Sequence, residues 1–147
     1  MSSVRNFLSE SDKDKVIDAI RQAEAHTTGE IRIHLEDRCK TEAYKRAVQV
    51  FHELKMHQTK FRNGILIYIA VKDRQFAILG DEAIDQKTDA HYWDEISAHL
   101  QKRFAEGMYA DGIAEVVQQT GKVLAQYFPN LENYLKNELP DDISYDE

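Results

Sequence analysis

The stretch RNGILIYIAVKDRQFAILGD, residues 62–81, decides the fold. It holds a continuous apolar run over 65–71 and a second apolar segment over 76–79, separated by a polar break. Two apolar segments around a short polar break predict a pair of antiparallel strands, with a two-residue turn at Asp73 and Arg74. Because the first run is continuous and does not alternate, we expect a central strand that is covered on both faces.

Two amphipathic helices are predicted before this stretch. Apolar residues at helical spacing predict one helix over 10–26, which Ser9 or Ser11 can cap. The same spacing predicts a second helix over 41–56, which Thr41 can cap. Both helices should lay an apolar face on the sheet.

A strand between these helices is predicted from the strict alternation of apolar and polar residues over 29–37, with His34 on its polar face. The order strand, helix, strand implies a parallel pair with a right-handed crossover, and the hairpin adds an antiparallel third strand. Helices should cover both faces of this sheet. We therefore expect a three-layer α/β/α sandwich around a small mixed sheet, made of a parallel pair and an antiparallel hairpin strand.

The C-terminal half of the chain continues in helices. An apolar stripe after the hairpin predicts one helix, and residues 109–128 predict another with Tyr127 on its buried side. We expect a single domain over 1–130. Over 131–147 we expect a short helix and an acidic tail that frays.

Composition narrows the range of partners. The chain has 147 residues, 26 acidic against 19 basic, and a net charge of −7, which disfavours a nucleic-acid partner because that contact depends on clustered Lys and Arg. Cations and cationic surfaces suit this charge better. The single cysteine, Cys39, cannot form an internal disulfide, and no window approaches the ~20 apolar residues of a membrane span. We therefore expect a cytoplasmic protein without a transmembrane segment.

Three polar motifs are predicted to meet at one edge of the sheet. Parallel strands begin at the same edge, and an antiparallel neighbour ends there. This places Thr-Thr-Gly-Glu over 27–30, Arg-Asn-Gly over 62–64 and Gly-Asp-Glu over 80–82 at the edge where the parallel strands begin. Carboxylates gathered at one edge favour a hard divalent cation with oxygen ligands, such as Mg²⁺ or Ca²⁺.

The candidate metal ligands at this edge are carboxylates. They are Glu30, Asp81, Glu82 and Asp85. Arg62, Asn63 and Gly64 are the candidate phosphate-binding residues, while Glu30 and Asp81 are also the candidate catalytic residues. The alternative is structural, with the glycines forming turns, Asp81 capping the next segment and Arg62 pairing with a surface carboxylate.

Other sites stay open. The opposite edge carries mixed charges, which are typical of a surface ion-pair cluster: Glu36, Asp37, Arg38, Asp73 and Arg74. The six histidines allow a zinc hypothesis, although no set of them has the spacing of a complete ligand set. Neither standard glycine-rich phosphate loop is present, so a nucleotide would have to be held in another way. Cys39 as a nucleophile has no histidine placed beside it by sequence.

The motifs together carry a family resemblance. T-x-G-E before one strand, and R-N-G followed by D-R and G-D around a hairpin, resemble the TPM domain family, named from thylakoid lumen, photosystem II repair and related membrane-associated proteins. The resemblance runs from about residue 17 to residue 129. It implies an α/β sandwich, divalent-cation binding at acidic loops and a phosphatase activity on phosphomonoesters or nucleotides. The family often reads Gly-Asp-x-Gly-Ile at the hairpin exit, where Ala83 stands at the fourth position here.

We therefore expect a domain that binds Mg²⁺ or Ca²⁺ and slowly hydrolyses phosphate esters or nucleoside phosphates such as ATP and ADP. Its partner would be a phosphorylated small molecule or an adenine nucleotide. Two alternatives stay open, a non-enzymatic, cation-regulated module that binds or assembles a protein partner, and a plain nucleotide binder. The first alternative rests on the lack of a standard nucleophile or phosphate loop.

Overall fold

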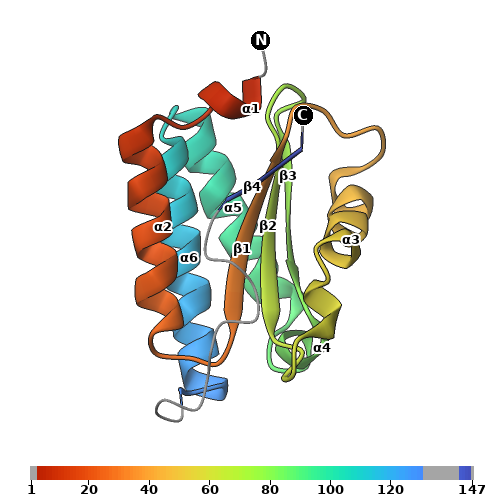
Figure 1. The fold of residues 1–147 in the computed structure, drawn as a ribbon, viewed down its shortest axis with the longest axis vertical. Helices are drawn as coiled ribbons and strands as arrows, with labels where there is room; N and C mark the ends of the chain where they lie inside the picture. The colour runs from red at the N-terminus through yellow and green to blue at the C-terminus, as the bar shows by residue number, and fades with distance from the viewer. Residues whose placement is uncertain (1–2, 131–142, 147) are drawn as a thin grey trace.

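The chain folds into three layers in the computed structural model, which describes residues 3–130 and 143–146. In chain order, the elements are α1 (Ser3–Asn6), α2 (Glu10–Glu24), β1 (Glu30–Glu36), α3 (Ala43–Glu53), η1 (Met56–Gln58), β2 (Gly64–Ala70), β3 (Gln75–Gly80), α4 (Glu82–Asp85), α5 (Ala90–Ala105), α6 (Tyr109–Tyr127) and β4 (Ser144–Asp146). Figure 1 shows α2, α5 and α6 on one face of the sheet and α3 on the other. The predicted α/β/α sandwich is confirmed.

The sheet is mixed, with strand order β3-β2-β1-β4. β1 and β2 are parallel, and β2 and β3 form the antiparallel hairpin. Because Ala70 pairs with Gln75, the hairpin connection is 71–74, and the predicted two-residue turn is wrong. This register brings Asp81 beside Gly64, whose carbonyl accepts a hydrogen bond from the Asp81 backbone at 2.9 Å.

β2 is buried along its whole length because each face meets an apolar cluster. Its residues Ile65, Ile67 and Ile69 belong to the larger cluster, to which α2, α5 and α6 contribute. Leu66 and Tyr68 belong to the smaller cluster under α3. The alternation of facing directions along a strand explains this division. The prediction of a central strand covered on both faces is confirmed.

The helix that begins the domain is specified by its first residues. Ser9 is the N-cap of α2, where its Oγ accepts a hydrogen bond from Asp12 N at 3.1 Å and Ser9 N donates to Asp12 Oδ2 at 3.2 Å. This reciprocal capping box selects Ser9 over Ser11. At α3 the N-cap is Glu42, without a side-chain cap, so the prediction of Thr41 is wrong.

The two C-terminal helices follow the predicted pattern, with one exception. α6 packs closely on α2, since a Cβ on Gly121 would lie 2.8 Å from the Cβ of Ala23. Tyr127, predicted on the buried side of α6, is 42% exposed at the last residue of the helix. Within the described residues, no helix is both long and apolar enough to cross a membrane.

β4 is an element that sequence reasoning missed. Residues 131–142, where a short helix is predicted, lie outside the described residues. Beyond them the tail does not fray as predicted, because Ser144–Asp146 pairs in parallel with β1. Ile143 anchors this strand in the larger apolar cluster, and Tyr145 packs against it. The added strand brings Asp146 opposite Glu36.

β1 is covered on both faces, although its alternation predicts one exposed face. His34, placed by that prediction on a polar face, is 4% exposed. The cover comes from β4 beside the strand, where Ser144 lies opposite His34, and from α3, whose Arg46 contacts Glu36. His34 is therefore buried among other polar residues, while Arg32 and Glu36 are partly buried, a pattern that alternation alone cannot distinguish from exposure.

Candidate functional site

The three predicted motifs meet at the amino edge, the edge at which β1 and β2 begin. Arg62 donates two hydrogen bonds to Asp81, from Nε to Oδ2 at 2.8 Å and from Nη2 to Oδ1 at 3.0 Å. These hydrogen bonds raise the pKa of the Arg62 guanidinium. Asn63 Nδ2 donates to Thr28 Oγ1 at 2.8 Å. Side-chain contacts therefore link strand ends that are distant in sequence.

At the amino edge, Asp81 accepts hydrogen bonds from the backbone as well as from Arg62. It is the N-cap of α4, and its Oδ1 accepts a hydrogen bond from Glu82 N at 2.8 Å. Glu82 in turn pairs with Arg62 Nη1 at 3.3 Å, and Asp85 is exposed on α4. Both oxygens of Asp81 are thus engaged in local contacts, which agrees with the structural alternative.

The glycines of the motifs lie against apolar side chains. A Cβ on Gly29 would meet Leu124 Cδ2 at 2.6 Å, and a Cβ on Gly80 would meet Trp93 Cζ2 at 3.0 Å. At Gly64 the corresponding neighbour is the side chain of Met56, at 3.3 Å. Close packing therefore accounts for glycine at positions 29 and 80, whereas at position 64 the contact is with the flexible end of the Met56 side chain.

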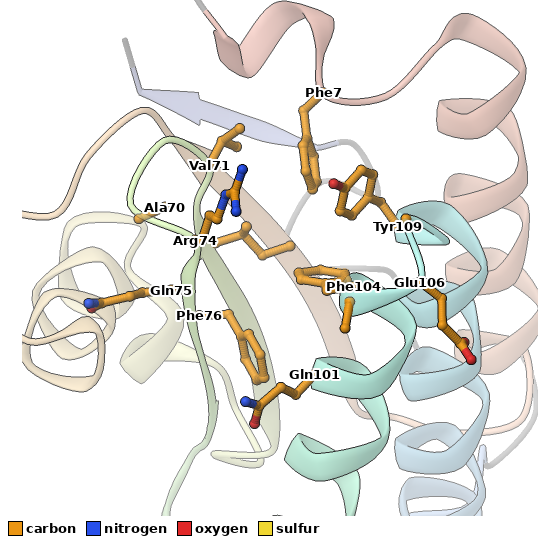
Figure 2. Close-up of a pocket in the computed structure, with 13 residues that line it drawn as sticks. Phe7, Ala70, Val71, Arg74, Gln75, Phe76, Gln101, Phe104, Glu106 and Tyr109 are labelled. Carbon is orange, nitrogen blue, oxygen red and sulfur yellow. The ribbon is translucent and has the colours of Figure 1, made fainter.

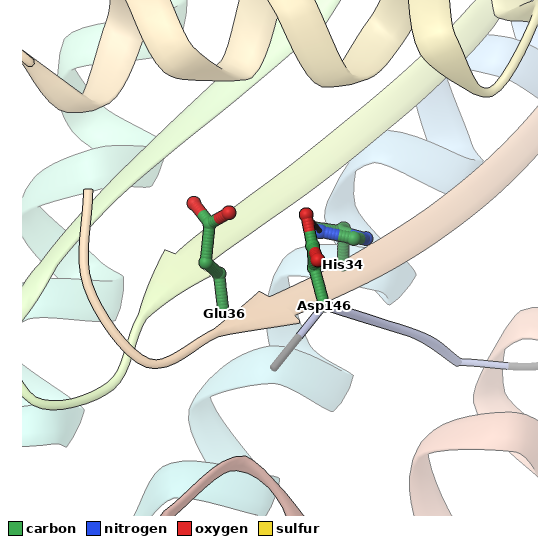
Figure 3. A group of neighbouring side chains, drawn as sticks. All are labelled: His34, Glu36 and Asp146. Carbon is green, nitrogen blue, oxygen red and sulfur yellow. Dashed lines mark ion pairs between the residues drawn. The ribbon is translucent and has the colours of Figure 1, made fainter. Parts of the chain in front are cut away.

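The predicted metal ligands of the amino edge do not form a ligand group in the part of the chain that the structure describes. There, one group of at least three His, Cys, Asp or Glu side chains has its potential ligand atoms within 4.8 Å of one another. It consists of His34, Glu36 and Asp146, which we call the His34 cluster (Figure 3). The cluster lies at the carboxyl edge, where β1 and β2 end. Cation binding at the amino edge stays a prediction.

The His34 ring is held by β4. Its Nδ1 lies 2.9 Å from Ser144 Oγ, within hydrogen-bond distance. Its Nε2 is buried and has no hydrogen-bond partner among residues 3–130 and 143–146. The nearest carboxylate oxygen with which it forms an ion-pair contact, Asp146 Oδ2, is 4.0 Å away, too far for a hydrogen bond. Nε2 is therefore a buried polar atom that faces two carboxylates.

Arg46 of α3 balances the carboxylates of this cluster. Its Nη2 donates to Glu36 Oε1 and to Asp146 Oδ2, both at 2.8 Å, and its Nε donates to Glu36 Oε2 at 3.0 Å. The Tyr68 hydroxyl also donates to Glu36 Oε2. Arg46 further contacts the exposed Glu53 at 3.1 Å. One guanidinium thus neutralises several acidic groups.

Burial and hydrogen bonding shift the pKa values of the cluster. Burial lowers the pKa of His34, although the nearby carboxylates of Glu36 and Asp146 oppose that shift, so the ring favours its neutral form. Burial alone would raise the pKa of Glu36, but the hydrogen bonds from Arg46 and Tyr68 outweigh it and keep that pKa below its usual value. A neutral imidazole beside ionised carboxylates is the protonation state that binds a metal ion.

A pocket of about 680 Å³ opens at this edge, on the side of α3. Its charged lining residues are Glu36, Asp37, Asp146, Arg38, Lys40, Arg46 and Lys72. Asp73 fixes the neighbouring loop, since it accepts hydrogen bonds from Cys39 N at 2.9 Å and from Arg38 Nη1 at 2.8 Å. The pocket therefore combines acidic and basic groups on a fixed loop.

The same loop contains Cys39, considered above as a nucleophile. Burial and the carboxylate of Asp73 raise the pKa of its thiol. A raised pKa disfavours the reactive thiolate. The structure therefore gives this cysteine no activation as a nucleophile.

Sequence reasoning missed five residues of this edge in their present roles. His34 and Glu36 are two apart in a strand and so share a face, and Tyr68 lies opposite His34 in register. Arg46 precedes the buried Val50 by four residues, which places it on the sheet side of α3. These signals were present in the sequence. Asp146 had none, because its position depends on the pairing of β4.

Comparisons with known proteins agree with this fold. The BA42 protein from the psychrophilic bacterium Bizionia argentinensis has a solved structure that matches with a TM-score of 0.87 and 40% identity, covering 95% of this chain and 96% of that one. The N-terminal domain of the cg2496 protein from Corynebacterium glutamicum matches with a TM-score of 0.65 and 14% identity, covering 89% of this chain and 82% of that domain. The second likeness shows the fold alone.

Two further matches concern sequence. A DNA ligase from Hahella chejuensis (strain KCTC 2396) is 42% identical over 55 residues, which is 37% of this chain and only 8% of the ligase. The family model of the TPM domain matches residues 2–123, most of the chain. This chain therefore belongs to the TPM domain family.

Proposed function

We propose that this chain is a divalent-cation-dependent hydrolase of phosphate esters, including nucleoside phosphates, and that it acts at the carboxyl edge. The observation that carries the proposal is His34 Nε2, which is buried without a hydrogen-bond partner in the described part of the chain and faces Glu36 and Asp146. A buried polar atom without a partner costs about 1–3 kcal/mol. A cation bound in the cluster would satisfy it.

The donor set of the His34 cluster fits a divalent cation. Glu36 and Asp146 offer carboxylate oxygens, and His34 offers a ring nitrogen. Mixed nitrogen and oxygen ligands suit Mn²⁺ or Zn²⁺ better than Mg²⁺ or Ca²⁺, which prefer oxygen ligands alone. Ser144 contacts the other ring nitrogen, as outer contacts of metal-binding histidines do. Such a cation supplies Lewis acidity towards a phosphoryl oxygen and an attacking water.

Basic residues of the same pocket would hold the phosphate. Arg38, Lys40 and Lys72 line it beside the carboxylates. Their charge favours the approach of a phosphate group to an otherwise acidic edge. Arg46 already contacts Glu36 and Asp146, so a cation would compete with its guanidinium for both.

The amino edge is a second placement for the same activity. There Glu30 and Asp81 would serve as ligands or base, with Arg62 and Asn63 as phosphate contacts and Mg²⁺ or Ca²⁺ as the cation. The convergence of three polar motifs supports this placement. The carboxyl edge has the stronger support, since Asp81 is engaged by Arg62 and by the start of α4.

The test measures phosphate release from ATP and from p-nitrophenyl phosphate with Mg²⁺, Ca²⁺, Mn²⁺ or Zn²⁺. We expect His34→Gln and Glu36→Gln to lower the cation-dependent rate at least about tenfold. Glu53→Gln is the matched control, because Glu53 is an exposed carboxylate that also contacts Arg46. Cation affinity, measured by calorimetry on the same variants, should fall in parallel with the rate.

The variants Glu30→Gln and Asp81→Asn separate the two edges. Rates that survive these changes but not His34→Gln support the carboxyl edge. The reverse result overturns this placement and moves the activity to the amino edge. Cation binding without phosphate release under any condition contradicts the hydrolase and favours a cation-regulated module that binds a protein partner.

A further inference from the structure

Four aromatic side chains gather on the face of the sheet away from α3, near the carboxyl edge. They are Phe7, which follows α1, Phe76 of β3, Phe104 of α5 and Tyr109 of α6. The ring of Phe7 lies 4.7 Å from that of Tyr109 and 6.1 Å from that of Phe104, centroid to centroid. Phe76 meets Phe104 edge to face at 5.7 Å. Segments far apart in sequence thus build one aromatic wall.

These rings line a cavity of about 720 Å³ that stays open to solvent (Figure 2). Ile69 and Val71 add aliphatic surface to it. The volume lies within the range of small-molecule sites, roughly 300–1,000 Å³. A planar aromatic ligand in this cavity could pack against these rings in the edge-to-face or offset geometry that aromatic pairs prefer.

Arg74 is the charged side chain that is available to a ligand in this cavity. The other charged lining residue, Glu106, accepts a hydrogen bond from Arg103 Nη1 at 3.3 Å and is directed away from the cavity in Figure 2. Gln75 points to the opposite side of the hairpin, where its Oε1 accepts from Cys39 Sγ at 3.6 Å. The polarity of the cavity is therefore cationic.

Arg74 has no partner of its own in the described chain. It is exposed, and no hydrogen bond, ion pair or ring contact joins its guanidinium to another residue among 3–130 and 143–146. Its backbone has a φ of 54°, a left-handed conformation that L residues rarely adopt. The preceding Asp73 is held by Cys39 on the other face of the hairpin. Arg74 is thus a free cation at the rim of an aromatic wall.

We propose that this cavity binds a small planar aromatic oxyanion, with its ring among the aromatic side chains and its anionic group on Arg74. A planar guanidinium pairs with a carboxylate or a phosphate through two parallel hydrogen bonds, which a neutral ligand cannot replace. The inference is independent of the proposed function, because the cavity and the His34 cluster lie on opposite faces of the sheet.

The test follows backbone amide shifts during titration with three probes of one shape. They are 2-naphthoate, 2-naphthyl phosphate and the neutral 2-naphthalenemethanol. We expect shifts around Phe76, Phe104 and Tyr109, and an affinity at least about tenfold higher for an anionic probe than for the neutral one. A preference for the phosphate over the carboxylate, or the reverse, identifies which oxyanion the site favours.

Three variants complete the test. Arg74→Gln should weaken anion binding about tenfold and leave the neutral probe unaffected. Arg21→Gln is the matched control, since it removes the same guanidinium from an exposed position on α2 that lines neither pocket. Ala105→Trp, at an exposed lining position, should block all three probes. Equal affinities for neutral and anionic probes, shifts elsewhere, or equal losses in Arg74→Gln and Arg21→Gln overturn the proposal.

Discussion

Each edge of the sheet places an arginine between carboxylates, but the two edges differ in what lies beside it. At the amino edge Arg62 pairs with the buried Asp81 and with the exposed Glu82, and neighbouring glycines pack against apolar side chains. At the carboxyl edge one guanidinium, that of Arg46, balances Glu36 and Asp146, and a buried imidazole nitrogen of His34 is left over. This difference supports the carboxyl edge as the proposed cation site, because a buried ring nitrogen there has no hydrogen-bond partner in the described chain.

The environments of the two ion pairs also differ. At the amino edge Asp81 is 6% exposed but Arg62 is 40% exposed, so water screens the guanidinium side of their pair. Arg46 is 16% exposed and Glu36 is 12% exposed, so their pair is largely desolvated. Removing one member of a desolvated pair leaves a charge without compensation. The two edges should therefore respond differently to the loss of an arginine or a carboxylate.

The largest expected effect is that of Arg46→Met. This change keeps the aliphatic part of the side chain and removes the charge that neutralises Glu36 and Asp146. We expect the free energy of unfolding to fall by about 3 kcal/mol in the presence of a chelator. Urea unfolding followed by circular dichroism measures this loss.

A divalent cation should reverse part of this effect. If the cation binds in the His34 cluster, Mn²⁺ or Zn²⁺ will stabilise Arg46→Met more than the wild-type protein, because the guanidinium no longer competes. The double variant Arg46→Met with His34→Gln should lose that rescue. If the cation stabilised Arg46→Met and the wild-type protein equally, the guanidinium and the cation would not share a site.

Asp81→Ala should have a smaller effect, of about 2 kcal/mol, through loss of the buried acceptor of Arg62 and of the cap of α4. Thermal unfolding with and without a cation checks this expectation. The cation-induced rise in Tm should be the same in Asp81→Ala as in the wild-type protein. A rise that disappears in Asp81→Ala would make the amino edge the cation site and reverse the comparison.

Much of the fold could be predicted because local signals and global packing agree. The continuous apolar run over 65–71 can be buried on both faces only in a central strand. The capping box at Ser9 fixes where α2 begins. The parallel pairing of β1 and β2 follows from the crossover helix. These features depend on short stretches of sequence, which a single chain reveals.

The candidate site could be predicted only in part, because its charges are matched by residues that are distant in sequence. The glycines of the amino edge indicate that another group comes close to the backbone. Sequence alone cannot tell whether that group is a ligand or a packed side chain, such as those of Leu124 and Trp93. At the carboxyl edge, the burial of His34 depends on a C-terminal strand separated from it by more than a hundred residues. Long-range pairing of a short polar strand leaves little trace in local composition.

The smallest effect, and the one specific to the carboxyl edge, concerns pH. Burial lowers the pKa of His34 from its ordinary value of 6.5, with Glu36, Asp146, Arg46 and Glu53 as the charged groups around it. Below pH 6.5 the unfolded chain binds a proton that the folded chain does not, so stability should fall as pH falls, by at most about 1.4 kcal/mol per pH unit.

His34→Gln should remove this loss of stability between about pH 7.5 and about pH 5.5, measured by urea unfolding with a chelator present. The depressed pKa of Glu36 acts only below its ordinary value of 4.5, outside that window. His91→Gln, the same change at an exposed histidine, should keep the wild-type pH dependence. If both variants behave alike, the His34 ring is not the group held neutral by burial, and the difference between the two edges loses its electrostatic basis.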